Sequence, residues 1–235
     1  MDEVLLRNPR IRIEEAIAAD NLPELLQISG MLHGHFCSFS ALGVKAAFRA
    51  VRDLGARSSG MEDVIAIVET NNCFSDGVQI VTGCSFGNNA LIFRDLGKTA
   101  FTLAKRNGDA IRISVKVDSS YLEEKEPETM ALFAKVIRNR NGTPEEEKRI
   151  QELWRDFSFK LLEVPDDEVF GIEKLKIIVP AYARIFSSVK CSVCGENIME
   201  TRARINNGKP VCIPCAGADY YQLAGDGISA IACRA

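Results

Sequence analysis

The feature that most restricts how this sequence can fold is a set of four cysteines near its end. They form two CxxC pairs, Cys191/Cys194 and Cys212/Cys215, separated by the seventeen residues 195–211. Four thiolates at this spacing match a closed, tetrahedral zinc site of the structural kind. The surrounding segment has too little apolar material to fold alone, so the metal would supply its stability. Two disulfides or four unrelated core thiols are the alternatives, and both are disfavoured in a chain without an export signal.

The residues around these pairs indicate a small separate domain at 188–235. Asn207-Gly208 predicts a hairpin turn between the two pairs. Pro214 suits the first turn of a helix that would run to Ala224. A zinc knuckle, a hairpin and a helix are the layout of a treble-clef or ribbon finger. Cys233 lies beyond the quartet, and no role is predicted for it.

A second group of candidate metal ligands lies near the start of the chain. His33-Gly34-His35-Phe36-Cys37 contains both histidines of the protein, with a cysteine two residues later. Imidazole nitrogens and a thiolate form a ligand set that suits zinc and other late transition metals. The alternative is two polar loop residues and a small buried thiol. Because the whole histidine complement sits beside a cysteine at the start of a helix, we favour a metal site.

Three more residues are candidates for this first site because they lie in predicted loops or helix starts. We rank His35 and Cys37 first as ligands, followed by His33 and Cys73. Asp76 and Cys84 are expected to be supporting residues or alternative ligands. The catalytic candidates, should the site be an active site, are Cys37, Cys73, Cys84 and Asp76. A metal-free pair, Cys37 with Cys73 or Cys84, that cycles through a disulfide is the competing interpretation.

Hydrophobic periodicity predicts a mixture of helices and strands, hence an α+β domain with a sheet flanked by helices. Asn107-Gly108 predicts a hairpin between two of the strands. The single tryptophan, Trp154, continues an apolar stripe with Ile150 and Phe157, so we expect it in the core. The expected helices lie at 13–19, 22–29, 38–54, 75–80, 127–137 and 144–163, and the expected strands at 64–69, 90–93, 99–105, 110–117 and 172–179.

Composition and charge limit the classes of function. The 235 residues are 46% hydrophobic and 26% charged, with a net charge of −3, which disfavours nucleic acid as a partner. No apolar run approaches the ~20 residues that span a bilayer. Met1–Val4 is acidic and begins no signal peptide. We therefore expect a cytoplasmic protein whose eight cysteines are reduced and serve metal binding or catalysis.

Four sequence blocks together resemble the FmdE family, which takes its name from formylmethanofuran dehydrogenase. The resemblance covers nearly the whole chain, and the finger matches the longer members of the family. The sequence departs from the family pattern at Ser38, Lys45 and Asn88. The blocks are His33–Cys37 with the following helix that holds Gly43, then Cys73 with Asp76 and Gln79, then Gly83–Gly87, and finally Gly97–Ala100.

This resemblance implies a thioredoxin-like α+β core over 1–187, a treble-clef finger over 188–235 and a homodimer. It also implies a metal, zinc or another transition metal, in a site formed by the histidine and cysteine blocks. The first functional hypothesis is a metal-binding protein that serves redox or metal-dependent one-carbon or molybdenum/tungsten-enzyme metabolism. The alternative is a non-catalytic accessory or metal-delivery protein that docks on a larger molybdenum or tungsten oxidoreductase.

Overall fold

The computed structural model describes residues 6–233, apart from the side chain of Ser119, and divides into two compact units. The first unit ends at Pro180 and the second begins at Ala181. This division lies a few residues before the expected boundary at Ser187–Ser188. The Met1–Val4 segment, in which we predict no signal peptide, lies outside the described residues.

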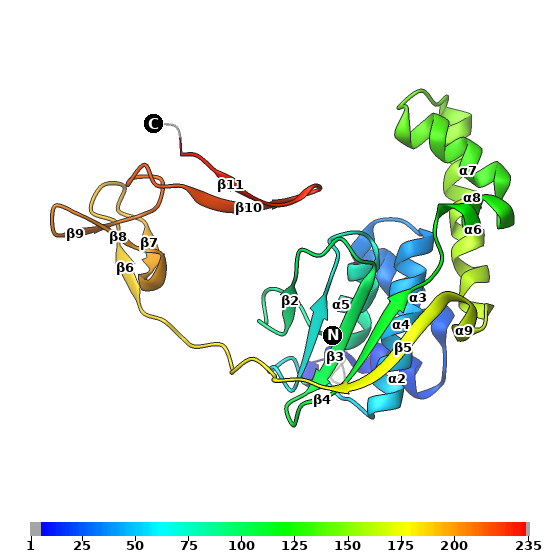
Figure 1. Cartoon of the computed structure of the whole chain (residues 1–235), viewed down its shortest axis with the longest axis horizontal. Coiled ribbons are helices and arrows are strands. Elements are labelled where there is room, and N and C mark those ends of the chain that lie inside the picture. Colours follow the sequence, from blue (N-terminus) through cyan, green and yellow to red (C-terminus); the bar gives the residue numbers. More distant parts are fainter. Residues whose placement is uncertain (1–5, 234–235) are drawn as a thin grey trace. The chain divides into compact units, whose positions relative to one another are not determined.

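The first unit is built on a five-stranded mixed sheet with the order β2-β1-β3-β4-β5 (Figure 1). β1 and β2 run parallel, and the other neighbouring pairs are antiparallel. Gly108, with φ of +89°, makes the predicted turn between β3 and β4. The strands are β1 (Val64–Val68), β2 (Leu91–Phe93), β3 (Ala100–Lys105), β4 (Asp109–Val115) and β5 (Phe170–Lys176).

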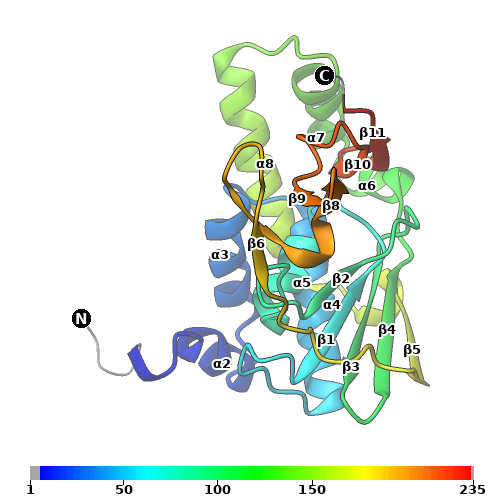
Figure 2. The same ribbon diagram turned by 90° about the vertical axis from the view of Figure 1, so that its left-hand side faces the viewer.

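Helices cover this sheet, as expected for an α+β domain. α4 and α5 pack against the sheet and against each other, and α3 packs on both of them (Figures 1 and 2). Among the described residues, no helix is long and apolar enough to cross a membrane. A thioredoxin-like core stays a prediction. The helices are α2 (Ile11–Ala18), α3 (Leu22–His33), α4 (Ser38–Leu54), α5 (Phe74–Thr82), α6 (Ser119–Lys125), α7 (Pro127–Leu132), the π-helix η1 (Phe133–Arg138), α8 (Pro144–Glu163) and α9 (Asp166–Val169).

The longest helix, α8, begins where the sequence predicts. Thr143 accepts a hydrogen bond from the backbone N–H of Glu146 at 3.3 Å, and the Glu146 carboxylate accepts one from the Thr143 N–H at 3.0 Å. This capping box satisfies two N–H groups that have no partner within the helix. Ile150, Phe157 and Leu161 form its buried face. The local sequence therefore determines this helix almost completely.

The end of α3 differs from the expectation that Gly30 would terminate it. The helix continues to His33, and Gly34 ends it with φ of +85°. Gly30 serves packing instead, since a Cβ at that position would lie 2.8 Å from the ring of Phe36. His33 thus stands on a rigid helix and not in a loop.

The first turns of α4 and α5 cross with their backbones in contact. A Cβ at Gly77 would lie 2.5 Å from both the Ser40 carbonyl oxygen and the Val44 nitrogen. A Cβ at Gly43 would overlap the Phe74 carbonyl group. Only glycine permits so close an approach. The crossing brings together the residues that precede the two helices, Cys37 and Cys73.

Lys45 lies in the core, although the sequence pattern places it on a polar face. Its side chain is only 6% exposed, and its ammonium group donates to the carbonyl oxygens of Leu162 and Val164. Its Nζ also lies 3.4 Å from an oxygen of Asp166. Lys45 therefore ties α4 to the end of α8.

Replacement of Lys45 by methionine is expected to lower the free energy of unfolding by about 2–4 kcal/mol, because buried acceptors lose a charged donor. Urea denaturation followed by circular dichroism measures the effect. Lys160→Met is the matched control, since the Lys160–Glu126 pair is exposed on the lysine side and should contribute less than about 1 kcal/mol. Equal losses in the two variants would contradict this role of Lys45.

The second unit consists of three short hairpins and a 3₁₀ turn. Asn207 and Gly208, both with positive φ, make the predicted turn between β8 and β9. β6 pairs with β7, and β10 pairs with β11. The elements are β6 (Ser188–Lys190), β7 (Asn197–Met199), the 3₁₀ turn η2 (Glu200–Arg202), β8 (Arg204–Asn206), β9 (Lys209–Val211), β10 (Tyr220–Ala224) and β11 (Gly227–Ile231).

The helix predicted from Pro214 to Ala224 is wrong. Gly217 takes φ of +60°, which interrupts any helix there. Tyr220 and Tyr221 favour a strand, and Gly227 follows a turn that reverses the chain into β11. The treble-clef assignment depended on this helix and is not confirmed within residues 181–233.

Candidate metal centres

The four cysteines of the second unit converge as the sequence predicts. Their sulfur atoms all lie within 4.8 Å of one another. The Cys194 and Cys212 sulfurs are 3.9 Å apart, close to the ~3.8 Å edge of a tetrahedron with Zn–S bonds of about 2.3 Å. The backbone N–H of Cys212 donates to the Cys191 sulfur at 3.3 Å. The N–H of Cys215 donates to the Cys212 sulfur at 3.4 Å. The donors thus have the geometry of a closed zinc site.

The surroundings of this quartet favour thiolates. Backbone N–H groups, that of Cys194 first and then that of Cys212, lower the pKa of Cys191 to about 6. A thiolate is the form that binds a metal. Cys233 lies nearer the finger than the sequence suggests, because its thiol donates to the Pro214 carbonyl oxygen at 3.8 Å. It is nevertheless not a member of the four-sulfur group.

The first unit brings His33, His35 and Cys37 together. One donor atom from each residue lies within 4.8 Å of the other two. The Nε2 atom of His33 is 3.6 Å from the sulfur of Cys37, and the two imidazole rings have centroids 4.4 Å apart. His33 ends α3, and Cys37 is the residue that caps α4. Helix ends hold both donors, and the tight turn at Gly34 lies between them.

Asp76 orients one of these histidines. Its Oδ2 atom lies 2.7 Å from Nδ1 of His33, and its Oδ1 atom accepts a hydrogen bond from the Gln79 amide at 3.1 Å. A carboxylate on Nδ1 leaves Nε2 unprotonated and aimed at the cluster, the usual arrangement behind a metal-bound histidine. Asp76 therefore has the position expected of a supporting residue.

Cys73 lies beside Cys37 across the helix crossing. A hydrogen bond with the Cys37 thiol, followed by the charge of His33, lowers the pKa of Cys73 to about 6. The pKa of Cys37 is raised by its interaction with Cys73 and by burial. The Cys37 sulfur also accepts the Ser40 N–H at 3.4 Å. Cys73 is thus placed as an additional ligand, although it is not within 4.8 Å of every donor in the cluster.

Cys84 is not part of this site. It follows the opposite end of α5 from Cys73 and is fully buried. Its thiol points to the carbonyl oxygen of Val64 at 3.6 Å, and burial raises its pKa. The suggestions that Cys84 is an alternative ligand or the thiol partner of Cys37 do not fit this position, because nine residues of helix separate it from the cluster.

A cavity of about 470 Å³ opens beside His35, and no pattern in the sequence indicates it. Trp154, expected in the core, is only half-buried and stacks on His35 with ring centroids 5.8 Å apart. Neighbouring side chains lower the pKa of His35, first by partial desolvation and then through the charge of His33. A neutral imidazole is the metal-binding form. The cavity is lined by Gly34, His35, Val136, Ile137, Arg140, Glu147, Ile150, Gln151 and Trp154.

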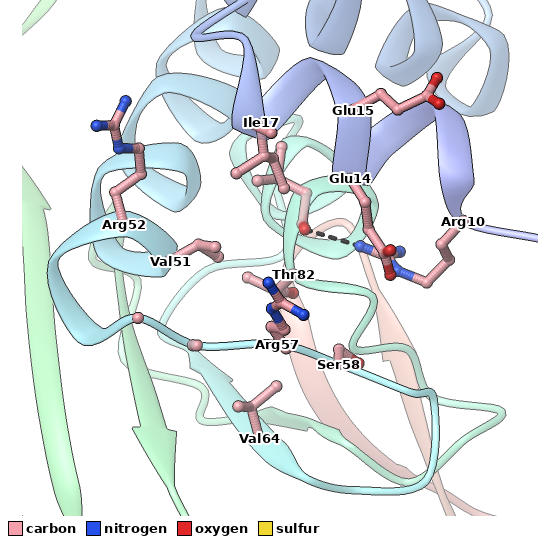
Figure 3. Close-up of a pocket in the computed structure, with 14 residues that line it drawn as sticks. Arg10, Glu14, Glu15, Ile17, Val51, Arg52, Arg57, Ser58, Val64 and Thr82 are labelled. Atoms are coloured by element: carbon pink, nitrogen blue, oxygen red, sulfur yellow. Dashed lines mark hydrogen bonds between the residues drawn. The ribbon is translucent and has the colours of Figure 1, made fainter. Parts of the chain in front are cut away.

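A larger cavity, of about 670 Å³, lies at the C-terminal ends of α4 and α5 (Figure 3). Arg10 closes one side by donating to the carbonyl oxygens of Ile80 and Val81 at 3.1 and 2.9 Å. Arg57, Glu14 and Thr82 also line it. The His33, His35 and Cys37 cluster does not contribute to it, so we place the candidate site at the opposite end of the two helices.

Comparisons with known proteins agree with these observations. Residues 32–171 match the family model described as "FmdE, Molybdenum formylmethanofuran dehydrogenase operon". Residues 184–221 match the prokaryotic dksA/traR C4-type zinc finger. The first match covers the N-terminal cluster and the cavity beside it, and the second covers the cysteine quartet.

One relative and one solved structure are informative. A protein of Archaeoglobus fulgidus described as a "Probable S-adenosyl-L-methionine-binding protein" is 40% identical over 222 residues, which are 92% of this chain. The chain spans 58% of that relative's length. The crystal structure of an FmdE-like protein of tungsten formylmethanofuran dehydrogenase from Syntrophus aciditrophicus shares the fold, with 22% identity and a TM-score of 0.51. That match covers 83% of this chain and 92% of the other. The chain therefore belongs to the FmdE family and has a C4 zinc finger after its FmdE domain.

Proposed function

We propose that His33, His35 and Cys37 hold a transition-metal ion that is distinct from the zinc of the finger. The ion would serve redox or metal-dependent chemistry in one-carbon or molybdenum/tungsten-enzyme metabolism. The observation that supports the ion most strongly is the convergence of three soft donors within 4.8 Å, one of them oriented by Asp76. The metabolic setting is supported by the operon for which the family is described.

The donor set suits an open site. Three protein ligands leave one position of a tetrahedral ion for water or a substrate, as in catalytic zinc sites. His35 is exposed and borders the cavity, whereas Cys37 is buried beneath it. Cys73 would either complete the coordination or hold a proton beside the ion. Asp76 and Gln79 would keep His33 in the metal-binding tautomer.

Metal content tests the proposal. Wild-type protein, purified anaerobically, is expected to contain two metal ions per chain by mass spectrometry. The double variant His35→Ala, Cys37→Ser should contain one, because each ligand lost weakens a three-ligand site severely. Cobalt substitution should show sulfur-to-metal charge transfer from both sites in the wild type and only from the finger in the variant.

Cys84→Ala is the matched control, since it removes a buried thiol of the same unit that lies outside the cluster. We expect this variant to keep both ions. If the double variant holds as much metal as the wild type, the first site does not bind a metal. The metal-free thiol pair would then be the better explanation, with Cys37 and Cys73 giving two electrons and two protons to an oxidant as they form a disulfide.

A non-catalytic accessory or metal-delivery role is the second candidate, and the exposure of His35 favours it. An ion held by one exposed ligand can leave towards a partner protein. Rapid loss of the first ion to a chelator, together with co-purification of a larger oxidoreductase from the native cell, would support this role. Slow metal exchange and turnover of a substrate would support the catalytic role. A homodimer and a cytoplasmic location remain proposals.

A further inference from the structure

We propose that the cavity lined by His35, Trp154 and Arg140 binds a small organic anion with a planar, apolar body. The cavity measures about 470 Å³, within the range of small-molecule sites. The inference deepens the proposed function and rests on it, because His35 would belong both to the metal site and to the wall of the cavity. It adds the chemical class of the molecule that the site receives.

An apolar, aromatic wall favours a planar body. The rings of His35 and Trp154 are stacked with an interplanar angle of 30°, and Phe133 packs on Trp154 from a second side. Val136 and Ile150 are both buried and line the same cavity. Flat conjugated groups pack well on such a surface. A half-exposed tryptophan in a cavity wall is typical of a surface that a ligand covers.

The charge at the cavity favours an anion. Arg140 is exposed there, and within residues 6–233 no carboxylate pairs with it. Glu147 also lines the cavity, but it lies near the start of α8, where the helix dipole offsets its charge. Gln151 follows one turn later and can donate from its amide. A metal ion at His35 would add further positive charge. An arginine fork recognises carboxylate and phosphate groups.

The backbone at this wall is unusual in two places. η1 is a π-helix of six residues, a conformation that often marks functional sites. Arg140 itself has φ of +52°, which a long side chain adopts at a cost of about 1–3 kcal/mol. Gly142 allows the loop to fold back on Val136, since a Cβ there would lie 2.9 Å from a Val136 methyl group. These features keep Arg140 at the cavity.

Fluorescence of Trp154 tests this inference directly, because it is the only tryptophan of the chain. Benzoate serves as the planar anion, benzamide as its neutral isostere and cyclohexanecarboxylate as a non-planar anion. We expect benzoate to change the emission saturably, with a Kd on the order of 1 mM, as suits a fragment of this size. Benzamide and cyclohexanecarboxylate should bind at least about fivefold more weakly, having lost the charged and the planar contact respectively.

Arginine variants identify the anion contact. Arg140→Gln should weaken benzoate binding by about fivefold or more, and Arg140→Lys should restore most of it. Arg138→Gln is the matched control, because Arg138 packs over the ring of Phe133 and does not line the cavity. That variant should bind benzoate like the wild type.

Measurements on metal-loaded and metal-free protein separate this inference from the proposed function. Metal content alone reports whether the first site holds an ion. Benzoate binding to the metal-free protein, sensitive to Arg140, reports the anion site. The inference is overturned if benzoate fails to change Trp154 emission at roughly tenfold the expected Kd. It is equally overturned if benzamide binds as well as benzoate, or if Arg138→Gln and Arg140→Gln weaken binding alike.

Discussion

Cys212→Ser releases one zinc ion per chain and unfolds the second unit: this is the expected result of removing one thiolate of the finger. Structural zinc contributes roughly 10–16 kcal/mol to small domains at neutral pH. The buried hydrophobic cluster of this unit contains only Cys191, Val211 and Cys212 among the described residues, and two of these three are themselves candidate ligands. Without the metal, too little apolar surface remains buried to order the hairpins.

Metal analysis after gel filtration measures the loss of zinc, and limited proteolysis should show cleavage after residue 180. Unfolding of the first unit, followed by circular dichroism, should keep its midpoint. Cys233→Ser is the matched control, since it removes a thiol of the same unit that lies near Pro214 but outside the quartet. Loss of zinc in this control would show that the fourth ligand is assigned wrongly. Unfolding of both units in Cys212→Ser would contradict their independence.

Gly77→Ala should have the largest effect in the first unit. The new methyl group would meet backbone atoms of Ser40, Gly43 and Val44 at 2.5–2.7 Å. Backbone cannot move aside as a flexible side chain can, so α4 and α5 must separate. We expect a loss of about 4 kcal/mol or more in the free energy of unfolding, which a domain of this size tolerates poorly.

Urea denaturation followed by Trp154 fluorescence measures this loss, and any folded fraction should be analysed for metal. Gly87→Ala is the matched control in the same unit, because its Cβ would have no neighbour nearer than 4.0 Å. It should change stability by less than about 0.5 kcal/mol. A Gly77→Ala protein as stable as Gly87→Ala would show that the helices are not in backbone contact. Metal content should fall together with the stability, since the same crossing places Cys37 beside Cys73.

The sequence by itself determines features that depend on residues close together in the chain. The spacing of the CxxC pairs predicts the finger ligands, because each knuckle forms within a few residues. The capping box of Thr143 and the turn at Asn107-Gly108 are predicted for the same reason. The helix expected after Pro214 fails, because the pairing of β10 with β11 outweighs the local signal of a proline. The three-residue cluster of His33, His35 and Cys37 is predicted because all its members surround one turn.

Only the tertiary structure decides which distant residues join that cluster. Asp76 reaches His33, 43 positions away, and Cys73 reaches Cys37 because two glycines let α4 and α5 touch. The same helix, α5, holds Cys84 at its far end in the core. Trp154 belongs to an apolar stripe that looks uniform in the sequence, yet it borders a cavity. Spacing along the chain specifies which face of a helix a residue occupies. What that face meets depends on how closely the helices pack, and at this crossing the glycines decide it.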